Sequence, residues 1–274
     1  MLVNGIHLHL RTEGTGPPCI LLHGYPETSY TWRHTIPALA RHFTVYAPDF
    51  RGWGESEARG PYSLDTMVDD ILALMDALGH ERYTLVGHDW GAATAYHIAR
   101  LHPERLDRLV TINMPAKRFN KWRPLHFYFF MLPLLPEVVM GLFGDGFVRL
   151  ILRWWAHRQD AFPESVVRYY QAAARRPGAN GATRSYYRNT MWDMALPRGK
   201  KQDLGPHARP RRVSVPWHVL WGAQDPVSPL ENVEYFREDV PGVPVTLIQD
   251  AGHFPQEEQP ERFNEALLAF LLAP

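Results

Sequence analysis

Short apolar runs alternate with helical stretches along this chain, and few architectures can accommodate such a pattern. Continuous apolar runs that read as buried strands lie at residues 19–22, 44–47, 83–86, 109–112, 217–221 and 243–248. Residues at helical spacing occupy 64–78, 92–101 and 260–272. Strands that alternate with helices in this way predict an α/β fold with a mostly parallel sheet and helices on both of its faces.

The alternation breaks once, after Pro115, where residues 116–204 become rich in Trp, Tyr, Phe, Arg and Pro. We therefore predict one core domain, formed by residues 1–115 and 213–274, that is interrupted by a helical cap and linker at residues 116–212. The apolar run from Leu125 to Phe143 contains two prolines and an acid. Because such residues are unfavourable in a membrane span, we interpret this run as helices that cover a pocket.

The composition gives few indications of binding partners or of the cellular compartment. Lys and Arg together number 29, as do Asp and Glu, so the formal net charge is +0 and no basic excess indicates nucleic-acid binding. The single cysteine, Cys19, excludes an internal disulfide and is expected in a buried strand. The first residues lack the features of a signal peptide. We expect a cytoplasmic protein without membrane or nucleic-acid partners, acting as a monomer or homodimer.

The run Gly87-His88-Asp89-Trp90-Gly91 follows a predicted strand and opens a predicted helix. This is the context of a nucleophile elbow, whose flanking glycines permit a tight turn that exposes the central side chain at the carboxyl edge of the sheet. The central residue is usually Ser, and here it is Asp. A carboxylate that attacks a saturated carbon forms an ester that water can cleave, so Asp89 indicates displacement at an epoxide or alkyl halide. The structural alternative is an Asp that caps the following helix.

The second step of such a reaction needs a base and a group that orients it. Asp225 and His253 each follow a predicted strand, so both should lie at the same sheet edge as Asp89, in the order nucleophile, acid, histidine. The backbone N–H groups of Tyr25 and Trp90 are candidates for an oxyanion hole. No cluster of metal ligands is evident among the histidines, and we expect neither a metal nor another cofactor.

These segments resemble the epoxide hydrolase and haloalkane dehalogenase branch of the α/β-hydrolase fold family. The resemblance rests on residues 23–27 (His-Gly-Tyr-Pro-Glu), 49–56 (Asp-Phe-Arg-Gly-Trp-Gly-Glu-Ser) and 87–92, and it covers nearly the whole chain. It implies an α/β-hydrolase fold with an inserted helical cap. By position it also implies that Asp89 is the nucleophile, Asp225 the acid and His253 the base.

The cap distinguishes the two activities, because an opening epoxide leaves an alkoxide that needs a proton, whereas a halide does not. Epoxide hydrolases supply two tyrosines, and residues 185–189 match one of their motifs with Tyr187 in the donor position. The second position falls on His126, or on Tyr128 if the alignment slips by two residues. A His here resembles a variant group that pairs His with Tyr. The residues expected to line the substrate pocket are Phe127, Phe130 and Tyr186.

The favoured interpretation is a hydrolase that opens a small apolar epoxide to a vicinal diol through an ester on Asp89, which water activated by His253 then hydrolyses. A haloalkane dehalogenase is the alternative, since Trp90 offers an indole N–H to a halide. However, Tyr25 stands where dehalogenases often have Asn, and the helix after Asp89 lacks the arginines of fluoroacetate dehalogenases. An esterase would require an anhydride at Asp89. A ligand-binding protein with little turnover also remains open, as do the identity of the epoxide and the regiochemistry and stereochemistry of its opening.

Overall fold

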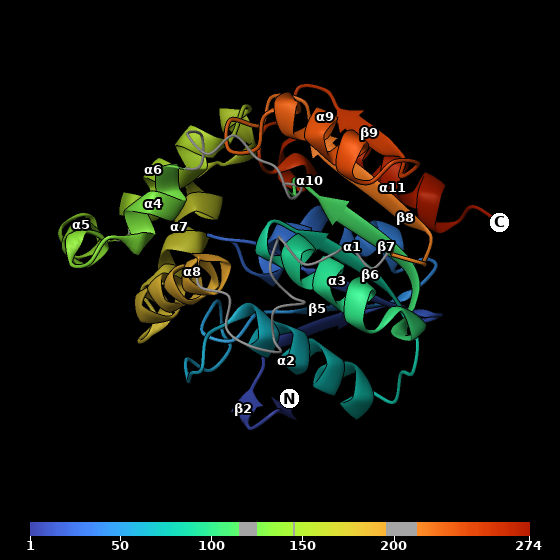
Figure 1. Cartoon of the computed structure of the whole chain (residues 1–274), viewed down its shortest axis with the longest axis horizontal. Helices are drawn as coiled ribbons and strands as arrows, with labels where there is room; N and C mark the ends of the chain where they lie inside the picture. Colours follow the sequence, from blue (N-terminus) through green and yellow to red (C-terminus); the bar gives the residue numbers. More distant parts are fainter. Residues whose placement is uncertain (115–124, 145, 196–212) are drawn as a thin grey trace.

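The computed structural model describes residues 1–114, 125–144, 146–195 and 213–274, and a seven-stranded sheet lies at its centre (Figure 1). The strands are β3 (Leu10–Glu13), β4 (Pro18–Leu22), β5 (Thr44–Pro48), β6 (Tyr83–His88), β7 (Leu106–Ile112), β8 (Trp217–Gly222) and β9 (Val245–Ile248). Their order is β3-β5-β4-β6-β7-β8-β9, and only the β3–β5 pair is antiparallel within this described sheet. The predicted mostly parallel sheet is confirmed. A separate hairpin of β1 (Leu2–Val3) and β2 (Ile6–His7) precedes it.

Helices cover both faces of the sheet, as predicted. They are α1 (Ile36–Leu39), α2 (Leu64–Ala77), α3 (Trp90–Leu101), α9 (Leu230–Asp239), α10 (Pro255–Glu258) and α11 (Pro260–Leu271). Alternate residues of β4 separate the two layers: Ile20 and Leu22 pack with α2 and α3, whereas Cys19 and Leu21 pack with α1 and α11. Cys19 is fully buried, as expected.

Helix α2 illustrates how local sequence sets an element. Its N-terminus is capped by Ser63, whose hydroxyl accepts the backbone N–H three residues further on. The buried face contains Met67, Ile71 and Leu74, spaced four and three residues apart. Gly79 follows the helix with a φ of +78°, a conformation that favours glycine and ends the helix.

In the described part of the chain between β7 and β8, five α-helices form the helical insertion: α4 (Leu125–Met131), α5 (Leu135–Phe143), α6 (Gly146–Trp155), α7 (Glu164–Ala174) and α8 (Ala179–Ala195). They gather on one side of the sheet, drawn in green to yellow in Figure 1. The expected insertion is therefore present. Its predicted limits at residues 116 and 212 lie outside the described part of the chain.

The apolar run from Leu125 to Phe143 forms two short helices, α4 and α5, with Pro133 between them. Across the described ranges, no helix combines the length and the apolar character that crossing a membrane requires.

Candidate active site

Asp89 lies at the turn between β6 and α3, in the strand–turn–helix context that the sequence predicts. Its φ is +51°, which is unfavourable for any residue other than glycine and marks a strained turn. A Cβ atom on Gly91 would lie 2.2 Å from the carbonyl oxygen of Leu22, and one on Gly87 would lie 2.3 Å from that of Gly91. Both flanking positions therefore require glycine for the turn to close.

The loop after β4 brings a backbone donor to Asp89. The N–H of Tyr25 donates a hydrogen bond to Asp89 Oδ1 at 3.0 Å. The approach is close, because a Cβ atom on Gly24 would lie 2.5 Å from the Cβ of Asp89. Burial opposes the ionisation of Asp89, but His253 and the N–H of Tyr25 outweigh it and hold the pKa of Asp89 below its ordinary value. The side chain of Asp89 is thus an accessible carboxylate, 18% exposed.

The three residues predicted as nucleophile, acid and base lie together. His253 follows β9, and its Nδ1–H donates to Asp225 Oδ2 at 2.9 Å. The other ring nitrogen, Nε2, lies 3.6 Å from Asp89 Oδ2. Asp225 follows β8, and its Oδ1 accepts the backbone N–H groups of Val227 at 2.7 Å and Ser228 at 3.0 Å. The imidazole therefore lies between two carboxylates.

This placement sets the charge of the imidazole. Burial alone would lower the pKa of His253, but the Asp225 and Asp89 carboxylates reverse that effect and raise it to about 10. At neutral pH the ring is a cation between two anions. Its charge therefore depends on Asp89 remaining ionised.

Asn113 directly follows β7 and joins the acid to the base, a role that its sequence context did not indicate. Its Nδ2 donates to Asp225 Oδ2 at 2.6 Å and to the carbonyl oxygens of Gly252 and His253 at 3.2 and 3.3 Å. Its Oδ1 accepts the N–H of Gly222 at 2.9 Å. The available signal was its position after a predicted strand, the same signal that identified Asp89, Asp225 and His253.

His88, the residue before Asp89, contacts the backbone of His253. Its Nε2 contacts the carbonyl oxygen of His253 at 2.7 Å, and its Nδ1 contacts the carboxylate of Glu27 at 2.7 Å. All three residues are buried. The motifs around His88 and Glu27 therefore also fix the loop of His253, a function that their sequence alone did not indicate.

On the opposite side, Tyr187 of α8 faces the elbow from the helical insertion. Burial raises the pKa of Tyr187 well above its ordinary value, the Asp89 charge adds to this rise, and the neighbouring Trp90 side chain opposes it. The ring stacks on Phe130 at 4.5 Å and meets Tyr25 edge-on at 6.0 Å. Tyr187 is thus a protonated phenol within an aromatic cluster.

Of the two candidates for a second donor, the structure brings His126 to the site and leaves Tyr128 outside. The His126 ring lies 4.8 Å from that of Trp155 and 5.8 Å from that of Tyr187, whereas Tyr128 is 43% exposed. Burial lowers the pKa of His126 to about 3, although the Asp89 charge opposes this, so the imidazole is neutral. A neutral ring offers one N–H donor.

The remaining predicted pocket residues lie in different places. Phe130 is buried against Tyr187, whereas the Tyr186 hydroxyl donates to the carbonyl oxygen of Arg51 at 3.1 Å. Tyr186 therefore anchors α8 to the core. The side chain of Phe127 lies outside the described part of the structure. Among the described residues, no group of three His, Cys, Asp or Glu side chains is placed to hold a metal ion.

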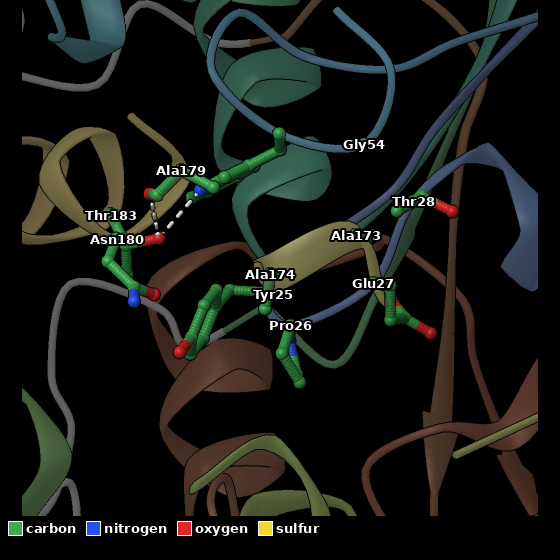
Figure 2. A pocket seen from close by; sticks show the side chains of 11 residues that line it. Tyr25, Pro26, Glu27, Thr28, Gly54, Ala173, Ala174, Ala179, Asn180 and Thr183 are labelled. Carbon is green, nitrogen blue, oxygen red and sulfur yellow. Dashed lines mark hydrogen bonds between the residues drawn. The ribbon is translucent and has the colours of Figure 1, made fainter. Parts of the chain in front are cut away.

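A cavity lies beside Tyr25, between the helices α7 and α8 and the loops that follow β4 and β5 (Figure 2). It encloses about 310 Å³, part of it open to solvent, and small residues such as Ala174 and Gly54 line it. At its edge the Trp53 Nε1–H donates to Thr183 Oγ1 at 2.9 Å, which ties α8 to the core loop. The cavity thus borders the residue whose N–H group binds Asp89.

Comparisons with known proteins agree with this fold. The family described as alpha/beta hydrolase fold matches residues 17–260. The AB hydrolase superfamily protein YfhM of Bacillus subtilis is 30% identical over 98% of this chain and 95% of its own length. Epoxide hydrolase A of Mycobacterium tuberculosis is also 30% identical, with the same two coverages. The crystal structure of a variant epoxide hydrolase from Bacillus megaterium superposes with a TM-score of 0.85 at 29% identity, covering 100% of this chain and 99% of that one.

Proposed function

The chain belongs to the alpha/beta hydrolase fold family, and we propose that it hydrolyses small apolar epoxides to vicinal diols through a covalent ester on Asp89. The observation that carries the proposal is a carboxylate at the nucleophile elbow, with the Tyr25 N–H on one oxygen and the His253 ring beside the other. Two relatives of similar length and shape are epoxide hydrolases by name, which supports the same choice.

In the first step, Asp89 attacks a ring carbon of the epoxide, and the bond from that carbon to oxygen breaks. The new alkoxide takes the phenolic proton of Tyr187, and an N–H of the neutral His126 ring assists. General-acid assistance of this kind contributes about 10²–10⁴-fold to a rate.

In the second step, the loss of charge at Asp89 allows His253 to act as a base. Once the carboxylate is an ester, it no longer raises the pKa of His253, and the imidazolium gives up its proton, which replaces the one that Tyr187 lost. The neutral ring then takes a proton from water, which attacks the ester carbonyl. The resulting oxyanion is stabilised by the N–H groups of Tyr25 and Trp90 until it collapses. The departing diol oxygen takes the proton from the imidazolium, and the new Asp89 carboxyl group returns its own proton to the ring. Asp225 and Asn113 keep the ring oriented.

The same nucleophile would serve a haloalkane dehalogenase, so the assignment depends on the groups around the leaving atom. A halide would need N–H donors such as the Trp90 indole, whose ring meets that of Tyr187 edge-on at 5.0 Å. An alkoxide would need a proton, which the Tyr187 phenol can supply, and a hydrogen bond, which the neutral His126 ring can donate. These contacts favour the epoxide as substrate.

The test is to trap the ester. We expect His253→Gln to form it and fail to hydrolyse it, so intact mass should show the protein plus one epoxide. The substrates are styrene-type, aliphatic and limonene-like epoxides beside haloalkanes, with Asp89→Asn as the control that forms no adduct. An adduct from haloalkanes alone would replace the proposal with dehalogenation. Ligand binding with no adduct from any compound would indicate a binding protein.

A further inference from the structure

A buried carboxylate next to the site binds four backbone N–H groups. Glu258, at the end of α10, is 2% exposed. Its Oε2 accepts hydrogen bonds from the N–H groups of His157 at 2.7 Å, Arg158 at 2.8 Å and Gly252 at 2.9 Å, and its Oε1 accepts one from Phe254 at 3.0 Å. One side chain thus fixes four backbone groups from two separate segments.

Two of these donors flank His253 in the chain, and the other two follow α6 in the helical insertion. A third connection joins the same segments, because the N–H of His253 donates to the carbonyl oxygen of Trp155 at 3.0 Å. The contact is tight: a Cβ atom on Gly252 would lie 2.5 Å from the nitrogen of His157. The loop that carries His253 is therefore fastened to the insertion through Glu258 on both sides of the ring.

The chemistry of this site suits a carboxylate and no other side chain of similar size. Two carboxylate oxygens accept about four hydrogen bonds, whereas an amide has one accepting oxygen and turns two donors toward its surroundings. Gln at position 258 would leave some of the four N–H groups facing an N–H₂ group. The backbone on both sides of His253 would then have to shift.

We propose that Glu258 is a positioning residue for His253 and that it acts on the hydrolysis of the Asp89 ester, not on its formation. This inference rests on the proposed function. Ester formation uses groups that the β6–α3 turn, the loop after β4 and helices α4 and α8 hold in place. Hydrolysis depends on where Nε2 holds the attacking water, and a displacement of about 1 Å at such a position costs about 10²-fold in rate.

The test compares two neighbouring buried glutamates of α10. Glu258→Gln should form the ester at the wild-type rate and hydrolyse it about 10–10²-fold more slowly, so kcat falls while kcat/KM stays constant. Glu257→Gln is the matched control, because its carboxylate contacts Arg33 and Tyr170 and makes no described bond to the His253 loop. In that variant we expect hydrolysis at the wild-type rate. Both rates come from intact mass after rapid quenching of a single turnover with a styrene-type epoxide.

Stability and mechanism are separated by two further measurements. Circular dichroism reports whether Glu258→Gln is folded, and Glu258→Asp, which keeps the charge on a shorter side chain, should slow hydrolysis in a protein nearer the wild type in stability. Wild-type hydrolysis in both Glu258 variants would overturn the inference alone, provided that His253→Gln still traps the ester. Equal slowing of both steps would reduce Glu258 to a general structural role. No ester in His253→Gln would overturn the proposed function as well.

Discussion

Replacing Asp89 with Asn should lower the pKa of His253 by a predictable amount, because it removes one of the two charges beside the ring. Asp89 Oδ2 lies 3.6 Å from His253 Nε2. Unit charges at that separation interact by about 4–5 kcal/mol at an effective dielectric constant of about 20. A change of one in pKa corresponds to about 1.4 kcal/mol. The pKa should therefore fall from about 10 to about 7.

The assay is an NMR titration of the protein labelled with ¹³C in its histidine rings. The His253 signal is assigned by its absence from the spectrum of His253→Gln. Asp107→Asn is the matched control, because this exposed carboxylate bonds to Arg82 on the surface, and it should leave the pKa of His253 at about 10. The Asp89→Asn variant imitates the uncharged ester. A pKa that stays at about 10 in this variant would refute the idea that esterification releases the base.

Three further predictions follow from the contacts around Asp89. Tyr187→Phe should slow ester formation by about 10²–10⁴-fold in stopped-flow experiments, whereas the exposed Tyr128→Phe should match the wild type; the reverse result would move the donor to Tyr128. Gly24→Ala should abolish turnover in a protein that still folds by circular dichroism, because its Cβ would lie 2.5 Å from that of Asp89, and an active variant would contradict this contact. The raised pKa of His253 should stabilise the fold fully below pH 6.5 and lose this contribution as the pH rises through about 10. Urea unfolding across that range should show a smaller loss in Asp89→Asn than in the wild type.

The sheet could be predicted from the sequence because buried parallel strands are continuous apolar runs, and each predicted run forms a strand. Strand β3 (Leu10–Glu13) was not predicted, because it is a half-exposed edge strand without a continuous apolar run. Its pairing is set by a distant partner, with Thr12 opposite Tyr46 on β5. Helix α9 was not predicted. The alternation of strands implied a connection at this place in the chain but did not identify which of its residues are helical.

The proposed catalytic residues could be located because glycines and strand ends mark them in the sequence. Asn113 also follows a predicted strand but was not singled out, whereas Glu258 carries no such mark. The role of Glu258 depends on N–H groups at His157 and Arg158, about a hundred residues away, and backbone donors look alike in any sequence. The sequence did not distinguish His126 from Tyr128 as the second donor. The distinction depends on which face of α4 points toward the site, and a shift of two residues in the alignment changes that face.

The position of the insertion has a consequence for how such genes can recombine. The groups that place Asp89 lie before residue 114, whereas Asp225, His253 and Glu258 lie after residue 213. A recombination crossover within the insertion would therefore join the half that carries Asp89 from one parent to the half that carries Asp225 and His253 from another. Asn113 and His88 both bridge the two halves, because the Asn113 amide binds Asp225 at 2.6 Å and Gly222 at 2.9 Å, and His88 Nε2 contacts the carbonyl oxygen of His253 at 2.7 Å. In a chimera, the fit of these two side chains to the incoming segments decides whether the acid and the base are held together.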